Sequence, residues 1–170
     1  MEKIGIFYSF RSVKTQQQVK KIKKALGEKN CEDVDADAAT LDDFKKFKNY
    51  ILAVPTWFDG ELPNYWDEYL PAIEDESFKG KKFAIFGGGD QKNYPENFID
   101  GVGIMAEFIE ERNGKIVGIT STEGYTYELS RAQRGDKFVG LAIDIENQAA
   151  LTDERIKNWC ADLKKEFGLK

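Results

Sequence analysis

Short apolar segments and amphipathic segments alternate five times along the chain, and this alternation limits the possible fold more than any other feature. The segments 3–8, 50–54 and 82–86 are almost entirely apolar, which is typical of strands buried on both faces. The segments between them carry apolar residues at helical spacing, as at Ile22 and Leu26. This order predicts a parallel sheet covered by helices on both faces.

The remaining expected elements follow the same order. A weak strand is expected at 31–37, and further strands are expected at 115–119 and 138–143. Helices are expected at 15–27, 40–47, 98–112 and 152–168, with another, after a turn-rich loop, that buries Trp66, Tyr69, Leu70 and Ile73. Thr15 and Thr40 are the expected helix N-caps. The stretch 120–137 is polar and aperiodic, and the chain contains no low-complexity linker, so we expect one domain over residues 1–170.

Composition excludes several function classes. With 25 Lys and Arg against 30 Asp and Glu, the net charge of −5 argues against a general nucleic-acid binder. Histidine is absent, so the chain alone cannot build a Ser-His-Asp triad, a Cys-His pair or a His-ligated metal site, and no metal is expected. Acid–base catalysis at neutral pH would depend on carboxylates, Lys or Tyr. The composition therefore favours a function that uses the chemistry of a bound cofactor.

Two cysteines and the lack of long apolar runs point to a cytoplasmic protein. Cys31 and Cys160 have neither CxxC spacing nor the density of a secreted disulfide scaffold, so free thiols are expected. No apolar run approaches the ~20 residues of a membrane span, and the N-terminal residues lack the apolar core of a signal peptide.

Three loops are candidates for a ligand site. In parallel sheets with helices on both faces, ligands bind beyond the carboxyl ends of the strands, where the strand order reverses. This rule selects the loops 9–15, 55–62 and 87–97. Each is rich in glycine, hydroxyl or aromatic residues, as expected for a cofactor site.

The chemistry of these loops suits a phosphorylated planar ligand, although each loop also has a plain structural reading. The loop 9–15 precedes a helix, whose free N–H groups favour phosphate, but it could equally be an ordinary capped turn. Trp57 and Phe58 are adjacent aromatics beside Gly60, which suggests a wall for a flat ring. Asp90 and Tyr94 add a carboxylate and a further aromatic in the third loop.

Over nearly its whole length the chain resembles the long-chain flavodoxins. The matching segments are KIGIFY at 3–8, PTWFDGELP at 55–63, DESFKGKK at 75–82, GDQKNYPENF at 89–98, GDKFVGLAID at 135–144 and LTDERI at 151–156. The resemblance implies an α/β, flavodoxin-like fold: a doubly wound five-stranded parallel sheet in a three-layer α/β/α arrangement. The stretch 120–137 would be the long-chain insertion that splits the last strand.

The resemblance also implies a site for one noncovalently bound FMN. Trp57 would be the inner stacking aromatic and Tyr94 the outer one. The Phe58–Asp59 peptide would lie where the backbone can flip to accept a hydrogen bond from the proton at flavin N5. Gly89 and Asp90 would face the pyrimidine edge. The full set of expected cofactor-binding residues is Ser9, Phe10, Arg11, Ser12, Val13, Lys14, Thr15, Pro55, Thr56, Trp57, Phe58, Asp59, Gly60, Gly88, Gly89, Asp90, Tyr94, Asn97 and Glu146.

One loop departs from the family pattern. Members usually read Thr/Ser-x-Thr/Ser-Gly-x-Thr, where this chain has Phe10 in place of a hydroxyl residue and Val13 in place of glycine. Phe10 removes a hydrogen-bond donor, and Val13 would be strained at a position needing φ > 0 or close approach of the phosphate. We expect both to weaken FMN binding, with Arg11 and Lys14 as partial compensation.

Three functions remain open at this point. The first is a flavodoxin that carries single electrons between a reductase and acceptor enzymes, without a substrate of its own. Its acidic surface would dock on basic faces of partner proteins, and a monomer is expected. The second is a flavodoxin-like protein that has lost FMN and is empty or binds another planar ligand, such as a tetrapyrrole or haem. The third, an FMN-dependent reductase, ranks last because the sequence offers no substrate pocket.

Overall fold

The computed structural model describes residues 2–170 and contains a central parallel sheet. Its strands, in the spatial order β2-β1-β3-β4-β5, are β2 (Cys31–Asp35), β1 (Ile4–Tyr8), β3 (Asn49–Ala53), β4 (Lys82–Gly88) and β5 (Lys115–Val117), with β9 (Leu141–Ile143) also paired to β4. All of these pairs are parallel. The expected doubly wound sheet is confirmed.

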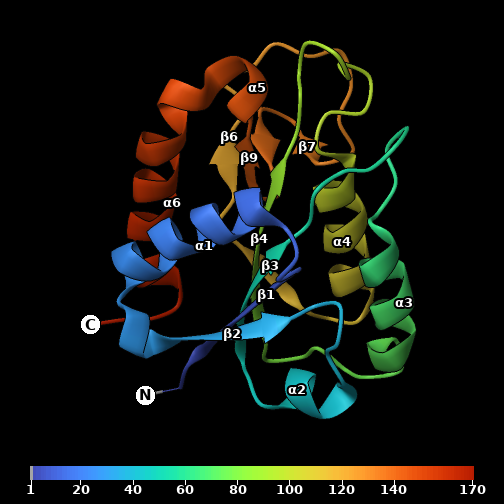
Figure 1. Cartoon of the computed structure of the whole chain (residues 1–170). Coiled ribbons are helices and arrows are strands. Elements are labelled where there is room, and N and C mark those ends of the chain that lie inside the picture. The colour runs from blue at the N-terminus through green and yellow to red at the C-terminus, as the bar shows by residue number, and fades with distance from the viewer. Residues whose placement is uncertain (1) are drawn as a thin grey trace.

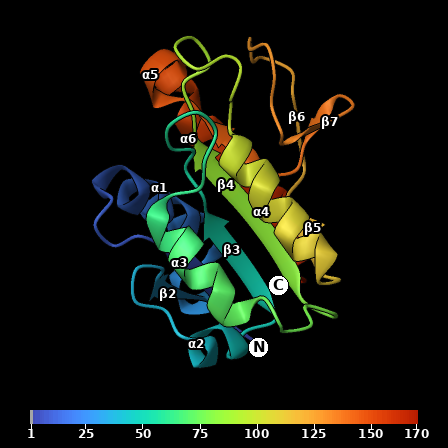
Figure 2. The same ribbon diagram turned by 90° about the vertical axis from the view of Figure 1, so that its right-hand side faces the viewer.

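Helices cover both faces of the sheet (Figures 1 and 2). The helices are α1 (Val13–Leu26), α2 (Leu41–Lys45), α3 (Asn64–Ile73), α4 (Asp100–Glu111), α5 (Ile145–Gln148) and α6 (Thr152–Glu166), with short 3-10 turns at Glu28–Asn30 and Ala149–Leu151. Figure 2 shows α3 and α4 side by side on one face, while α1 and α6 lie on the other. None of these helices is long and apolar enough to cross a membrane, within the part of the chain that is described.

Alternate strand residues supply two separate cores. Phe7 and Leu52 join the core under α3 and α4, while Ile6 and Ile51 join the core under α1 and α6. This period of two is the geometry of a strand, so fully apolar strands are the ones that can be buried on both faces. The alternation noted in the sequence is therefore explained by burial on both sides of one sheet.

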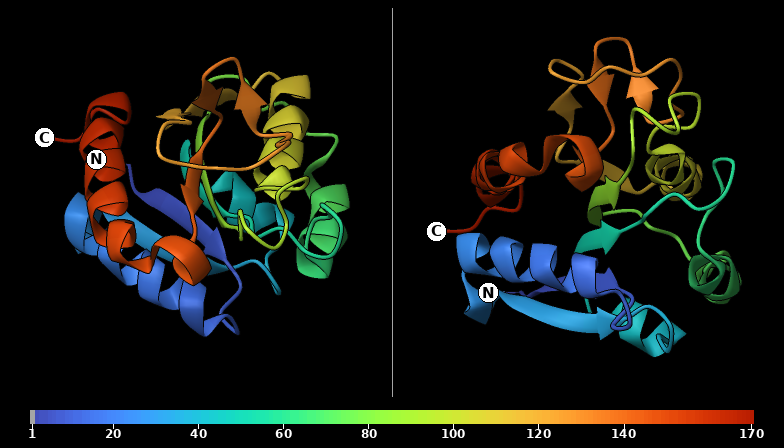
Figure 3. Two further views of the ribbon diagram at one scale, coloured as in Figure 1. Left: turned by 90° about the horizontal axis from the view of Figure 1, so that it is seen from above. Right: turned by 45° about the horizontal axis from the view of Figure 1, so that its top comes forward.

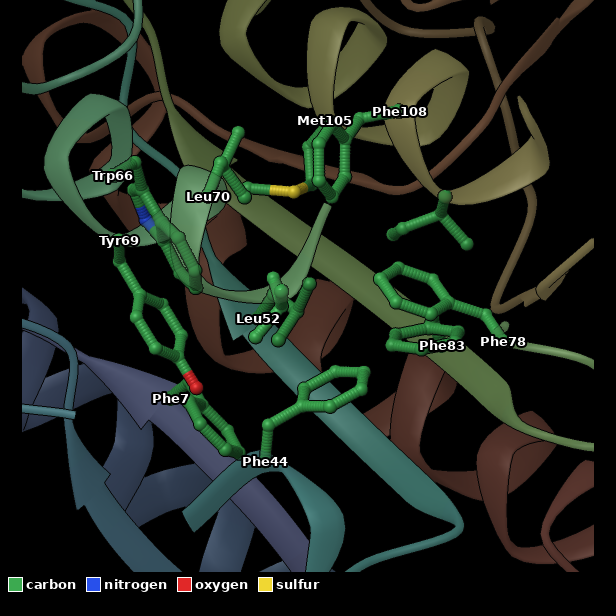
Figure 4. A pocket seen from close by; sticks show the side chains of 12 residues that line it. Phe7, Phe44, Leu52, Trp66, Tyr69, Leu70, Phe78, Phe83, Met105 and Phe108 are labelled. Atoms are coloured by element: carbon green, nitrogen blue, oxygen red, sulfur yellow. The ribbon is translucent and has the colours of Figure 1, made fainter. Parts of the chain in front are cut away.

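The core under α3 and α4 is unusually aromatic (Figure 4). Trp66 and Tyr69 from α3 face the sheet, and Phe44, Phe78 and Phe83 gather at the other end of the same layer. Each of these rings lies 4.9–6.3 Å from a neighbouring ring, within the range of favourable aromatic pairs. The void among them measures about 10 Å³, room for a single water at most. It is core and not a ligand site.

The last strand of the sheet is split, as the resemblance implied. β5 pairs with residues 82–84 of β4, and β9 pairs with residues 86–88. The intervening segment contains a small antiparallel sheet of β6 (Thr120–Ser121), β8 (Lys137–Phe138) and β7 (Gln133–Arg134), which the sequence did not predict. The expected single strand over 138–143 is wrong, because its first residue pairs in this small sheet and the central sheet resumes at Leu141.

The two expected helix caps have different outcomes. Thr40 forms a full capping box with Asp43, which confirms the start of α2. The cap of α1 is Ser12 and not Thr15, since the Thr15 amide donates to Ser12 Oγ at 3.3 Å. The expected Thr15 cap was wrong because Val13 and Lys14 already have helical backbone, which moves the helix start three residues earlier.

Candidate functional site

The three candidate loops meet at one edge of the sheet, beyond the carboxyl ends of β1, β3 and β4 (Figure 3). The strand order reverses between β1 and β3, because the chain leaves β1 toward β2 and returns to build β3 and β4 on the other side. The sheet topology therefore creates a crevice at this edge. In Figure 1 the loop after β4 rises to the top of the molecule, beside α5.

Most of the expected residues line one cavity of about 290 Å³, here called the inner cavity. It lies between the start of α1, the loop after β3, the loop after β4 and the end of β9. Eleven of the residues expected from the sequence contribute to its wall, namely Ser12, Lys14, Thr15, Pro55, Thr56, Trp57, Gly88, Gly89, Asp90, Tyr94 and Glu146. The sequence therefore identified most of the wall of this cavity.

A second cavity of about 370 Å³, here called the outer cavity, adjoins the first. It shares Thr56, Trp57, Gly89, Asp90 and Tyr94 with the inner cavity and adds Phe58 and Asn97 among others. Trp57 is 38% exposed and Tyr94 is 56% exposed, although aromatic side chains normally lie in the core. Two partly exposed aromatics in the walls of one cleft can hold a planar ring between them.

The loop before α1 presents hydroxyl groups and one cation to the inner cavity. Ser12 Oγ and Thr15 Oγ1 lie 2.9 Å apart, and both residues face the cavity at the start of the helix. Lys14 Nζ forms an ion pair of 3.1 Å with Glu146 Oε1. A helix start with free N–H groups, two hydroxyls and a lysine is a suitable site for a phosphate group.

The structure places the other residues of this loop outside both cavities. Arg11 pairs with Asp37, which also accepts a hydrogen bond from Ser9 Oγ. Burial would raise the pKa of Asp37, but the bonds from Ser9 and Arg11 hold that pKa below its usual value. The Phe10 ring packs on Tyr8, with 4.9 Å between ring centroids. Val13 begins α1 with its side chain 66% exposed.

The loop after β3 forms a tight turn with a strained residue at its tip. Trp57 and Glu61 exchange two backbone hydrogen bonds of 2.8 Å, which close the turn. Phe58 has a φ of 48°, a left-handed conformation that is costly for a bulky side chain. Gly60 has a φ of 92°, and a Cβ there would lie 2.6 Å from Asp100 Oδ2. Asp59 lines neither cavity, but its carbonyl accepts a bond of 3.1 Å from Asn97.

The loop after β4 is fixed by a buried carboxylate. Asp144 has an exposed fraction of 0% and accepts hydrogen bonds from the Gln91 amide (3.1 Å), Gln91 Nε2 (2.7 Å) and the Asn147 amide (3.0 Å). The Asn147 side chain also donates to Asp144 and to Asp90, at 2.8 Å from Asp90 Oδ1. Asp144 therefore joins the loop after β4 to the first turn of α5.

Hydrogen bonds also set the charge of these carboxylates. Burial alone would raise the pKa of Asp144, but the bonds from Asn147 and Gln91 outweigh it and keep that pKa below its ordinary value. The pKa of Asp90 is lowered in the same way, by the backbone bond from Asn93 and the side-chain bond from Asn147. Both carboxylates are therefore charged at neutral pH.

Sequence reasoning missed six residues at this site, two of which, Phe98 and Ile99, line the outer cavity. Gln18, Ile143 and Ile145 line the inner cavity, and Asp144 supports the third loop. Gln18 could have been found, because it lies one helical turn after Thr15 and borders the buried stripe of α1. Asp144 gave no local signal, since its partner Gln91 is 53 residues away.

Comparisons with known proteins bear on the whole of this chain. The flavodoxin family model matches residues 6–159. A curated flavodoxin from Nostoc sp. is 44% identical over 168 residues, which cover 99% of this chain and 99% of that protein. The chain belongs to the flavodoxin family. A flavodoxin from Klebsiella pneumoniae is 37% identical, covering 97% of this chain and 98% of that protein.

A flavodoxin of solved structure has nearly the same fold. The crystal structure of Fusobacterium nucleatum flavodoxin bound to flavin mononucleotide is 35% identical, with a TM-score of 0.91, and the match covers 98% of this chain and 99% of that one. The insertion and the divergent loop 9–15 both lie within the segments that flavodoxins match. They are therefore variations within a flavodoxin chain and not signs of a different fold.

Proposed function

We propose that this member of the flavodoxin family binds one FMN in the cleft formed by the inner and outer cavities and carries single electrons between proteins. The observation that carries the proposal is the shared cleft, in which Trp57 and Tyr94 lie in the same walls as the hydroxyl-bearing start of α1. An isoalloxazine ring and a phosphate are the two ends of FMN, and these two features suit them. Flavodoxins are themselves an example of ligand binding at the β1/β3 switch point.

Each side of the cleft has a distinct task in this proposal. Trp57 and Tyr94 flank the ring and exclude water from its faces, which leaves an edge open for electron exchange. Ser12, Thr15 and the start of α1 hold the phosphate. Asn97 holds the carbonyl of Asp59, and Gly89 with Asp90 borders the ring at its pyrimidine edge. FMN itself, when bound, supplies the one-electron chemistry.

The strained turn at Phe58 fits a role near the ring. Residues held in sparsely populated backbone conformations persist where the surroundings over-determine them, and they gather at functional sites. The turn is closed by the Trp57–Glu61 pair and braced by Asn97, so its frame is held while the Phe58–Asp59 peptide remains at the tip. We propose that this peptide accepts a hydrogen bond from the proton at flavin N5, as the family resemblance implies.

The comparisons do not favour a flavodoxin-like protein that has lost FMN. Full-length relatives at 37–44% identity are flavodoxins, and a neighbour with a TM-score of 0.91 carries FMN. A tetrapyrrole such as haem would also lack a histidine ligand in this chain.

The visible spectrum of the protein, purified without added cofactor and then titrated with FMN, tests the proposal. We expect flavin absorption bands after purification or after addition of FMN, together with quenching of FMN fluorescence by Trp57 and Tyr94. A protein that remains colourless and leaves FMN fluorescence unchanged would refute FMN binding. Haem titration by absorbance, run alongside, would detect the alternative ligand.

Val13→Gly is expected to change the affinity for FMN by less than about threefold, or 0.7 kcal/mol. Val13 was expected to weaken FMN binding only if its backbone were left-handed or if the phosphate approached it closely. The left-handed non-glycine residues in the described chain are Phe58, Ile99 and Asn113, and Val13 lines neither cavity. The substitution should cost up to about 1 kcal/mol of stability, because glycine disfavours the helix. A tenfold gain in affinity, measured by fluorescence titration, would show that Val13 does obstruct the phosphate.

We also propose basic redox partners, a monomeric state, a single domain over residues 1–170 and a cytoplasmic location. Exposed acidic residues flank the cleft, including Asp59, Glu61 and Glu96, and the net charge is −5. Such a surface attracts basic docking faces. The two free cysteines suit a reducing compartment.

Electron transfer to a basic haem protein is expected to slow about tenfold between ~10 mM and ~300 mM salt, because exposed charges are screened beyond ~10 Å. Stopped-flow absorbance with the reduced, FMN-loaded protein measures the rate. A small neutral quinone is the control acceptor, whose rate should not depend on salt. A salt-independent rate with the basic protein would rule out steering by the acidic residues.

A further inference from the structure

A cavity of about 400 Å³ lies outside the cleft, between α6 and the segment that splits the last strand. It is here called the α6 cavity, and Figure 1 shows β6 next to α6. None of the described residues in its wall also lines the inner or the outer cavity. The proposed FMN site therefore leaves this cavity without a role.

Arg155, in the wall of the α6 cavity, is the one arginine of the described chain that forms no ion pair with a carboxylate. The other four each have such a partner; they are Arg11, Arg112, Arg131 and Arg134. In Arg155, Nη1 is closed to solvent and has no hydrogen-bond partner among the described residues. A buried charged donor without an acceptor costs free energy. The guanidinium of Arg155 therefore lacks the acceptor that its charge requires.

Tyr125 fixes the plane of this guanidinium. The Cζ atom of Arg155 lies 4.0 Å from the centroid of the Tyr125 ring. The ring is itself anchored, because the Tyr125 hydroxyl donates a hydrogen bond of 2.6 Å to the Ala142 carbonyl. An arginine stacked on an aromatic face keeps its N–H groups at the edge of its plane, where they match the two oxygens of a carboxylate. Arg155 is thus preorganised for a carboxylate.

An exposed apolar side chain lies in the same wall. Ile119 is 52% exposed, and it lines the α6 cavity. The preceding residue, Gly118, has a φ of 73° and is bonded to α6 through both of its backbone groups. Its amide donates to Glu166 Oε1 at 3.2 Å, and its carbonyl accepts from Trp159 Nε1 at 2.8 Å. Anchored backbone therefore holds Ile119 at the cavity, where it can contact the apolar part of a ligand.

The charges of the wall favour a ligand with a single negative charge. Lys137 adds a second cation beside Arg155, while Glu123 and Asp162 add two carboxylates. Lys137, Glu123 and Asp162 are exposed, so water and salt screen their charges. The two carboxylates still disfavour a dianion such as a phosphate ester. One carboxylate on an apolar body matches one guanidinium beside Ile119.

We propose that the α6 cavity binds a small monocarboxylic acid with an apolar body. The carboxylate accepts hydrogen bonds from Arg155, and the body packs on Ile119 and Tyr125. The site shares no wall residue with the cleft. The inference therefore does not rest on FMN binding, and either one can fail without the other.

Phenylacetate and phenylacetamide are the matched probes, because they differ only in the charged group. In amide NMR spectra of the purified protein with excess FMN, we expect about 10 mM phenylacetate to shift the backbone signals of Thr120, Ser121 and Tyr125. The same concentration of phenylacetamide should leave these signals unchanged. A protein that binds no FMN still reports on the α6 cavity through the same three signals.

Two variants and a control assign the interaction to Arg155. Arg155→Gln should weaken phenylacetate binding at least about tenfold, the effect of losing one charged hydrogen bond. Arg155→Lys keeps the charge but not the planar fork, so its affinity should lie between those of the wild type and Arg155→Gln. Arg134→Gln is the control, since Arg134 is exposed, pairs with Glu110 and lies outside the α6 cavity. It should bind phenylacetate as the wild type does.

Several outcomes would overturn the inference. Equal shifts with both probes would show that the carboxylate is not recognised, and no shift with phenylacetate would show that the cavity does not bind it. Shifts confined to Trp57 and Tyr94 would place the probe in the cleft. Unchanged affinity in Arg155→Gln, or an equal loss in Arg134→Gln, would remove the role of Arg155. The comparison of the two probes uses the wild type alone, so it stands even if Arg155→Gln does not fold.

Discussion

Replacing Asp144 by alanine is expected to lower the free energy of unfolding by about 3–5 kcal/mol. The carboxylate accepts bonds from Gln91 and Asn147, and its removal leaves the buried donors of Gln91 without an acceptor. Chemical denaturation monitored by far-UV circular dichroism measures the change. Asp162→Ala, an exposed change on α6, is the matched control and should cost less than about 0.5 kcal/mol.

The same carboxylate gives the protein a sensitivity to acid. Because the pKa of Asp144 is lower in the folded protein than in the unfolded chain, the folded state binds the proton less readily. Its contribution is fully present above the ordinary pKa of aspartate and is lost as the pH falls through the folded value. We expect Asp144→Ala to show a flatter acid limb than the wild type. An identical acid limb, or a loss of stability below ~1 kcal/mol, would contradict the role given to Asp144.

Removing both aromatic walls is expected to lower FMN affinity about 100-fold, because each wall contributes ~0.5–3 kcal/mol through stacking and apolar burial. Trp57→Ala and Tyr94→Ala should each weaken binding, and the double variant Trp57→Ala/Tyr94→Ala should weaken it most. Fluorescence titration of the apoprotein measures the affinity. Leu151→Ala, which removes an exposed apolar side chain outside both cavities, should bind FMN as the wild type does.

The comparison of single and double variants also locates the ring. If the ring lies between the two side chains, both single variants lose affinity and the double variant loses more than either. If only Trp57→Ala loses affinity, the ring lies on one wall alone. Full affinity in the double variant would place the flavin outside the cleft.

The elements that the sequence predicted well are those whose pattern is local. The strands at Ile4–Tyr8 and Asn49–Ala53 are apolar on both faces, and their burial follows from that composition alone. The three loops followed from a topological rule and needed no contact information. Eleven of the expected site residues therefore line the inner cavity.

What the sequence did not reveal depends on contacts between distant residues. Asp144 follows a strand and precedes a short helix, and nothing beside it indicates that Gln91 will donate to it. Arg11 and Lys14 are equivalent cations in the sequence, yet Asp37 draws one away from the cleft and Glu146 holds the other beside it. The direction of a long side chain is set by charges on other elements, which a linear pattern does not record.

The split last strand has a consequence for how this chain can be shortened. Ala84 pairs with Val117, and Phe86 pairs with Leu141. The register therefore leaves the place of one residue, opposite Ile85, between the two pieces. A chain rejoined there through a single residue would regain an unbroken edge strand without shifting any other strand.

Removing the segment between β5 and β9 would also change the packing of the core. Ala132 and Phe138, which lie between the two strand pieces, are both 0% exposed, and Phe138 packs against Phe98 with 6.0 Å between ring centroids. A rejoined chain would have to replace Phe98 with a smaller or polar side chain. The intervening segment is thus packed on its host, and its exchange would require compensating changes at Phe98 and also at Gln91 and Asp100, which accept hydrogen bonds from the amides of Thr126 and Arg131.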